Sequence, residues 1–196
     1  MTRRIVVVPL TVPSWCPPGI DPDAWRRALA EDVVDLLATL AEVTPAIAVV
    51  PADRPVADAV AWPGTRVYEL PALTSELIFA AAAGDGYEQA ALIAADAPDL
   101  PGMLVGKLLR PLSSRPVSVA PSLTGGLVGL AARLPAPPWL PPLDLDAGIA
   151  DVRKAAPEPG QVGAGTGWHR LTGPDGLARL DPGLEGWAAT RALLGG

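Results

Sequence analysis

The sequence predicts an α/β fold, in which three layers (α/β/α) surround a mainly parallel sheet. Short β-branched or apolar runs alternate along the chain with segments of helical spacing. Several of these runs are almost free of polar residues, which is typical of strands that helices cover on both faces. The chain has 196 residues, of which 49% are hydrophobic and 18% are charged, so one large domain with a buried core is expected.

The first half of the chain supplies strands and helices in regular alternation. Residues 4–10 are predicted to form the first strand, because "IVVV" is β-branched and a proline follows. Asp21 suits the N-cap and Pro22 the first position of a helix whose apolar residues share one face. The elements expected next are a strand at 46–50, a short helix in "ADRPVADAVA", a strand in "TRVYEL", and a helix in "SELIFAAAAG" that Thr74 caps.

The second half continues this alternation and ends in a tail. The run at the start of "AALIAADAPDLP" predicts a buried strand, and residues 100–112 predict a helix. "RPVSVAPSLTGGLVGLAARLP" gives a strand, a Gly-Gly turn and an apolar segment that fits either a helix or a strand, and in "LDLDAGIAD" an apolar strand is expected to run into a helix. We expect one domain over residues 1–156, and a linker with a C-terminal helical tail packed on it over 157–196.

Composition and charge limit which classes of binding partner and which cellular compartment are expected for this protein. The single cysteine, Cys16, excludes an internal disulfide and a cysteine-based zinc site, and it favours a reducing compartment. The net charge is −6 and the 15 basic residues are scattered, so nucleic acid is not expected as a partner. No apolar stretch reaches the roughly 20 residues of a membrane span. The N-terminus lacks the cleavage site of a signal peptide, so a cytoplasmic location is expected.

Two carboxylates bracket a proline where the strand in "AALIAADAPDLP" ends. In parallel sheets, ligands bind outside the carboxyl ends of the strands, and Asp96 and Asp99 lie at such an end. Carboxylate oxygens are the ligands that Mg²⁺ and Mn²⁺ prefer. The alternative is purely structural, with Asp96 capping the helix that begins near Pro98 and Asp99 favouring the helix dipole.

A second acidic cluster lies in "LDLDAGIAD", which contains Asp144, Asp146 and Asp151. Two acidic strand ends in one parallel sheet can converge on a single metal ion. Here too a structural alternative exists, in which Asp146 caps the next helix and Asp151 lies on its solvated face.

Other patterns point to chemistry less specifically. "GAGTG" at 163–167 resembles a phosphate-binding loop, but no strand precedes it, so a linker is favoured. The only histidine, His169, follows it and is interpreted as a surface or packed side chain. A thiol–imidazole pair of Cys16 with His169 has no support in the spacing, and no Gly-x-Ser-x-Gly elbow occurs.

Several segments, taken in order, resemble the short bacterial glycosyltransferase-like proteins of the GT-A superfamily, which also includes the molybdenum-cofactor and phospholactate guanylyltransferases. "PGIDPDAWRRALAEDVVDLL" resembles the first helix of that family. "GYEQAALIAADAPDLP" resembles its Gly-Tyr-x-x-Val-Val-Leu-Ile-Gly-x-Asp-x-Pro-x-Leu segment, "APSLTGGLVGL" its Gly-Gly loop, and "PPLDLDAGIADV" its closing Asp-x-Asp-Thr-Pro-x-Asp-Leu. The resemblance covers roughly residues 4 to 156.

The resemblance implies a Rossmann-like sheet of the nucleotide-diphospho-sugar transferase type. The implied activity is metal-dependent transfer of a glycosyl or nucleotidyl group from a nucleotide-activated donor, with Mg²⁺ or Mn²⁺ as cofactor. Asp96 is the principal metal ligand by this comparison, with Asp146 or Asp99 assisting, and Gly125 and Gly126 form the loop that binds the nucleotide. The expected partner is a nucleotide or nucleotide sugar, and a homodimer is the oligomeric form considered.

The sequence also departs from the family pattern. The basic Lys-Thr-Arg element that follows the first strand in the family is replaced by "LTVPSWCPPG", which holds no cation. Thr124 and Leu127 stand where the family loop has an acidic and an aromatic residue. A second hypothesis follows, in which the chain is a catalytically degenerate GT-A-like protein that binds a ligand or a partner.

Overall fold

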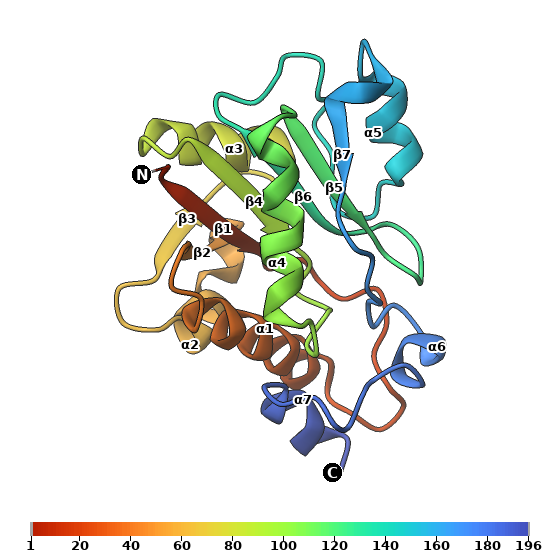
Figure 1. The fold of residues 1–196 in the computed structure, drawn as a ribbon. Coiled ribbons are helices and arrows are strands. Elements are labelled where there is room, and N and C mark those ends of the chain that lie inside the picture. The colour runs from red at the N-terminus through yellow and green to blue at the C-terminus, as the bar shows by residue number, and fades with distance from the viewer. Residues whose placement is uncertain (1, 196) are drawn as a thin grey trace.

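The computed structural model describes residues 2–195, and within them seven strands form one sheet (Figure 1). The strand order is β3-β2-β1-β4-β6-β5-β7. The strands are β1 (Arg4–Pro9), β2 (Thr44–Val49), β3 (Arg66–Glu69), β4 (Gln89–Ile93), β5 (Val117–Pro121), β6 (Leu127–Arg133) and β7 (Val162–Ala164).

Strand direction determines which strand ends meet at each edge of the sheet. Only β6 runs antiparallel to its neighbours β4 and β5, and every other pairing is parallel. The carboxyl ends of the parallel strands therefore meet the β5–β6 turn at the same edge. The chain moves outward from β1 through β2 to β3 and then returns to the other side of β1 with β4. Such a switch in strand order leaves a crevice where ligands bind in open α/β sheets.

Helices cover both faces, as the apolar strands require. The helices are α1 (Pro22–Ala38), α2 (Arg54–Val60), α3 (Ser75–Gly84), α4 (Gly102–Leu109), α5 (Ile149–Ala155), α6 (Pro174–Leu177) and α7 (Ala188–Leu193), with 3₁₀ turns at Pro51–Asp53, Arg110–Ser113 and Pro159–Gln161. One core cluster joins α1, α2 and α4 to one face of the sheet, and a second joins α3 and α5 to the other. The predicted three-layer α/β fold with a mainly parallel sheet is confirmed.

The local signals predicted the helices α1, α3 and α4, but of the caps predicted for them only Asp21 is confirmed. The side chain of Asp21 accepts a hydrogen bond of 2.8 Å from the backbone N–H of Ala24, and Pro22 opens α1. Thr74 precedes α3 without a side-chain capping bond. The helix predicted at 100–112 forms as α4 followed by a 3₁₀ turn, and its N-cap is Pro101. Asp96 therefore does not cap α4.

The structure resolves one segment that the sequence left open and differs from the sequence prediction in two others. The apolar segment after the Gly-Gly turn is the strand β6, since it pairs on both sides in the sheet. Residues 143–146 form no strand, although the N–H of Leu127 bonds to the carbonyl of Leu145 at 2.7 Å. The segment expected as a linker supplies β7, which pairs with β5. The boundary at residue 156 stays a prediction.

The C-terminal helix is attached to α1 through a buried carboxylate. Asp32 of α1 accepts hydrogen bonds from the N–H groups of Ala189 and Thr190, at 2.9 and 2.8 Å, at the start of α7. Burial raises the pKa of Asp32, and these hydrogen bonds partly offset it. The helix α7 is thus fixed beside α1, as Figure 1 shows. None of the helices in residues 2–195 has the length and apolarity to cross a membrane.

Candidate functional site

The predicted site residues gather at the carboxyl edge, near the switch in strand order. Asp96 follows β4, and residues 10–20 follow β1 beside it. Thr124, Gly125 and Gly126 lie in the turn from β5 to β6, at the same edge. Asp146 joins them through residues 143–146, whose backbone bonds to the start of β6 at Leu127.

Arg170 lies between the two principal carboxylates. Its Nε donates to Asp96 Oδ1 at 2.7 Å and its Nη2 to Asp96 Oδ2 at 3.0 Å, which is the bidentate geometry of a strong arginine–carboxylate pair. Its Nη1 donates to Asp146 Oδ1 at 2.9 Å and to the carbonyl of Leu145 at 2.9 Å. Asp96 and Asp146, which are far apart in the sequence, therefore bind the same cation. This cation is the guanidinium group of Arg170.

Arg170 is charged and mostly shielded from water. Its side chain is 6% exposed, that of Asp96 is 9% exposed, and that of Asp146 is 73% exposed. Burial, the largest influence on the pKa of Arg170, lowers it, but the hydrogen bonds and charges of Asp96 and Asp146 together raise the pKa above its ordinary value. The buried pair is therefore Arg170 with Asp96, and Asp146 is an outer partner.

The backbone around Arg170 is held on both sides. The N–H of Leu171 donates to the carbonyl of Asp96 at 2.7 Å. Thr124 Oγ1 accepts from the N–H of Arg170 at 3.1 Å and donates to its carbonyl at 3.0 Å. Thr124, which stands where the family resemblance expected an acidic residue, is thus a fixed support for the Arg170 segment.

Gly126 allows the close packing around this arginine. It has φ +75°, and a Cβ there would lie 2.6 Å from the carbonyl oxygen of Leu145 and 3.0 Å from Arg170 Nη1. Gly125 also has a positive φ, +103°, but a Cβ on it would meet no atom within 4 Å. In this structure the Gly-Gly turn makes room for Leu145 and Arg170, and its role in binding a nucleotide stays a prediction.

We expect Gly126→Ala to destabilise the protein by about 2–4 kcal/mol, because a left-handed backbone and a clash with the Leu145 backbone add together. Gly125→Ala is the matched control, with backbone strain alone and a cost of about 1 kcal/mol. Urea unfolding of both variants measures the difference. Equal costs for the two variants would contradict the close packing described here.

Asp99 has partners of its own. Its Oδ1 accepts from Trp168 Nε1 at 3.1 Å, and its Oδ2 accepts from the N–H of Asp181 at 3.3 Å. Nε2 of His169 lies 2.9 Å from Asp99 Oδ1, and its ring stacks on that of Trp168 with centroids 4.9 Å apart. Asp99 and the only histidine are both buried and attach the C-terminal segment to the domain.

The remaining acidic residues of the second cluster have local tasks. Asp144 Oδ1 accepts from the N–H groups of Asp146 and Ala147, at 3.0 and 3.2 Å, and shapes this turn. Asp151 Oδ2 accepts from the N–H of Gly148 at 2.8 Å at the start of α5. The capping task predicted for Asp146 as an alternative thus falls to Asp151.

A second cation near the site, Arg26, was not identified from the sequence. Arg26 Nη2 donates to the carbonyl of Leu10 and to Asp53 Oδ2, the latter at 2.6 Å. The hydrogen bond from Arg26 lowers the pKa of Asp53. Arg26 also borders a void of about 10 Å³ next to Asp96. A basic residue therefore lies beside the loop after β1, but it is engaged with this carbonyl and carboxylate.

The space at this edge is small. A cavity of about 70 Å³ lies among Thr11, Leu73, Asp146 and Arg170. Pockets for small molecules commonly hold roughly 300–1,000 Å³. The cavity beside Arg170 is well below this range.

This donor set does not fit a divalent ion as it stands. Mg²⁺ and Mn²⁺ need several oxygen ligands around an accessible position, whereas both carboxylate oxygens of Asp96 bind Arg170. Within residues 2–195, no three His, Cys, Asp or Glu side chains gather into a potential metal cluster. The structure brings Asp96 and Asp146 together and gives Asp99 other partners, so their role as metal ligands stays a prediction.

Comparisons with known proteins identify the fold. No family model matches the sequence, and no curated protein matches it. A protein from Desulfovibrio desulfuricans G20, assigned as a nucleotide-diphospho-sugar transferase, has a similar structure with a TM-score of 0.68 at 20% identity, over 99% of this chain and 97% of that one.

Two further solved structures are similar over nearly their whole length. The Rv0371C protein of Mycobacterium tuberculosis in complex with manganese has a TM-score of 0.61 at 16% identity, over 100% of this chain and 99% of that one. The 4-diphosphocytidyl-2C-methyl-D-erythritol synthase of Anaerococcus prevotii has a TM-score of 0.59 at 10% identity, over 98% and 96%. At these identities the likeness establishes the fold, which is that of the nucleotide-diphospho-sugar transferases.

Proposed function

We propose that the protein is a catalytically degenerate relative of the nucleotide-diphospho-sugar transferases and serves as a ligand- or partner-binding module. One observation carries this proposal: the Arg170 guanidinium holds both oxygens of Asp96 and one of Asp146. A guanidinium supplies positive charge to these carboxylates but has no vacant coordination position for a phosphate oxygen. A metal-dependent transfer of a nucleotide-activated group therefore lacks its metal position here.

The attachment of the Arg170 segment supports a permanent arrangement. Arg170 and Leu171 bond to Thr124 and to the Asp96 carbonyl, and the start of α7 bonds to Asp32. Lids that open during turnover come from the least stable parts of a protein, with few buried contacts. The Arg170 segment differs from such a lid, because it is held by a buried ion pair and by these backbone hydrogen bonds.

A second candidate function, a metal-dependent nucleotide-using transferase, is favoured by the convergence of Asp96 and Asp146. Their oxygens contact nitrogens of the same guanidinium at 2.7 to 3.0 Å, so both carboxylates lie beside one positive charge. The manganese complex of a protein with this fold is consistent with such a site. For this function, the Arg170 segment has to leave the carboxylates when the metal and the nucleotide bind.

Titration of the wild-type protein with nucleoside triphosphates and nucleotide sugars, with and without Mn²⁺, separates the two functions. We expect no Mn²⁺-dependent rise in the melting temperature and no Mn²⁺ binding in calorimetry at concentrations that saturate ordinary transferases. The second candidate predicts both signals, and it predicts that Asp146→Ala, a change at a largely exposed side chain, weakens them.

Arg170→Gln tests directly whether the Arg170 guanidinium keeps a metal ion away from Asp96 and Asp146. Removal of the guanidinium frees the carboxylates, so we expect this variant to bind Mn²⁺ measurably where the wild type does not, and Arg170→Gln with Asp146→Ala to bind it less. Arg170→Lys is the matched control, because it keeps a positive charge at the position. Mn²⁺-dependent nucleotide binding by the wild type, lost in Asp96→Ala, would refute the degenerate site.

A further inference from the structure

A larger cavity lies at the opposite edge of the sheet, near the amino ends of β1 and β4. Its volume is about 580 Å³, within the range of small-molecule pockets. Arg4 and Gln89, the first residues of these two strands, form its floor. One wall comes from α4 and the turn that follows it, and the other from residues 40–43 between α1 and β2. This place is independent of the carboxyl edge and of the function proposed there.

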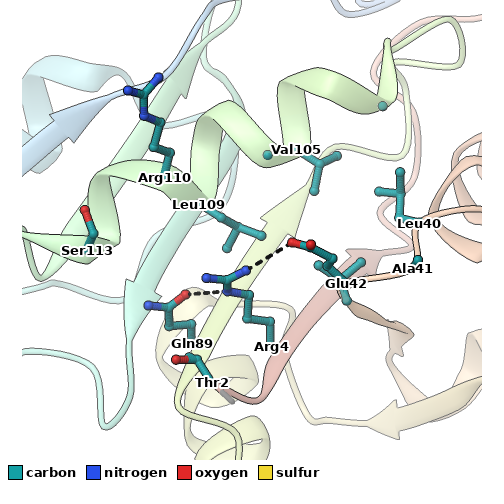
Figure 2. Close-up of a pocket in the computed structure, with 13 residues that line it drawn as sticks. Thr2, Arg4, Leu40, Ala41, Glu42, Gln89, Val105, Leu109, Arg110 and Ser113 are labelled. Carbon is teal, nitrogen blue, oxygen red and sulfur yellow. Dashed lines mark hydrogen bonds and ion pairs between the residues drawn. The ribbon is translucent and has the colours of Figure 1, made fainter.

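The upper part of the cavity is apolar because of two features. Leu40, Val105 and Leu109 line it, as Figure 2 shows above and beside Arg4. Gly106 of α4 also lines it, and a Cβ at this position would meet no atom within 4 Å. By contrast, a Cβ on Gly102 would lie 3.1 Å from Leu40 Cδ2, where α4 approaches the opposite wall. The missing side chain at Gly106 thus leaves part of the groove open.

The floor carries a cation with unused donors. Arg4 Nε donates to Gln89 Oε1 at 3.0 Å, which fixes the side chain. Arg4 Nη1 lies 3.6 Å from Glu42 Oε2, and within residues 2–195 neither terminal nitrogen of Arg4 donates a hydrogen bond. The Arg4 side chain is 34% exposed and that of Glu42 is 77% exposed. Glu42 is therefore a loosely held carboxylate beside a positioned guanidinium (Figure 2).

We propose that this cavity binds a small amphipathic carboxylate, with its carboxylate on Arg4 and its hydrocarbon part against Leu40, Val105 and Leu109. The positive charge of the floor recognises the carboxylate of the ligand, and the apolar wall recognises its hydrocarbon part. Arginine matches a carboxylate with two parallel hydrogen bonds, and within residues 2–195 neither terminal nitrogen of Arg4 donates one, although Nη1 pairs with Glu42 at 3.6 Å. Glu42 marks the place of the ligand's carboxylate and competes with it.

Calorimetric titration with octanoate tests the proposal, with acetate and octanol as probes that lack the tail or the charge. We expect saturable binding of one octanoate per chain, and affinities for acetate and octanol that are lower by about tenfold or more. Arg4→Gln should lower the octanoate affinity by about tenfold or more, and Arg4→Lys by less. Glu42→Gln should raise it about two- to fivefold, because a competing carboxylate is removed.

Gly106→Leu tests the cavity itself and is expected to fold, since leucine favours a helix more than glycine does. The new side chain occupies the groove, so octanoate binding should be lost. Gly84→Leu is the matched control: Gly84 ends α3, is exposed, does not line the cavity, and has open space around its Cβ position. It should bind octanoate as the wild type does, and circular dichroism confirms that both variants are folded.

Three results would overturn the proposal. They are no saturable octanoate binding by the wild type, equal affinity for octanoate and acetate, and unchanged octanoate affinity in both Arg4→Gln and Gly106→Leu. Asp146→Ala should leave octanoate binding unchanged, so this outcome is separate from any result on the carboxyl edge.

Discussion

Arg170→Met is expected to lower the free energy of unfolding by about 3–5 kcal/mol, because it leaves the Asp96 carboxylate buried without its counter-ion. The Asp96 side chain is 9% exposed, so water cannot replace the two hydrogen bonds that it loses. Methionine keeps much of the volume, so the change isolates the loss of charge and hydrogen bonding. Urea unfolding at neutral pH, followed by far-ultraviolet circular dichroism, measures the cost.

Two further variants show whether loss of the buried Asp96–Arg170 pair causes the expected drop in stability of Arg170→Met. Asp146→Asn removes the outer carboxylate, which is 73% exposed, and should cost less than about 1 kcal/mol. A double variant, Asp96→Leu with Arg170→Met, removes both members of the pair and should be more stable than Arg170→Met alone. A cost below about 1 kcal/mol for Arg170→Met would mean that the Asp96–Arg170 pair contributes no more than a surface ion pair.

Trp25→Ala should cost about 3–5 kcal/mol, since Trp25 is completely buried and a cavity would remain. Its ring packs with Leu29 and Leu171 in the cluster that joins α1 to the C-terminal segment. Its Nε1 donates to the carbonyl of Trp15 at 3.0 Å, and the two rings meet edge to face at 6.3 Å. Thermal and urea unfolding should both show the loss.

Trp62→Ala is the matched control for Trp25→Ala, because the same residue type is removed where the side chain is 54% exposed. Its indole bonds to Asp35 at 2.6 Å, but this contact is exposed, so the expected cost is below about 1 kcal/mol. If Trp25→Ala cost as little as Trp62→Ala is expected to cost, the cluster around Trp25 would add little to the attachment of the tail.

The sequence allowed much of the fold to be predicted, because its signals are local. Asp21 and Pro22 mark the start of α1 through the backbone groups next to them, and the β-branched run of β1 needs no distant partner to be recognised. The segment after the Gly-Gly turn could not be settled, since β6 is a strand only by pairing with β4 and β5. β7 is three residues long and lies between glycines and prolines, so it gave no periodic signal.

The site could be predicted only in part for the same reason. Asp96 and Asp146 were expected at one edge because each was predicted to follow a strand. No strand forms at residues 143–146, but the two carboxylates do share a partner. The identity of that partner was not accessible, because Arg170 is 74 residues from Asp96 and follows a segment that gave no strand or helix signal. Charge pairing across such a separation depends on tertiary structure alone, which no local pattern records.

The separation between Asp96 and Arg170 also governs the order of events during synthesis. Ribosomes add about 5–20 residues per second, so the 74 residues between the carboxylate and its counter-ion take roughly 4–15 s to make. During that interval β4 and Asp96 have been made, but the arginine that binds the Asp96 carboxylate has not. The buried Asp96–Arg170 pair therefore cannot form before Arg170 has been synthesised.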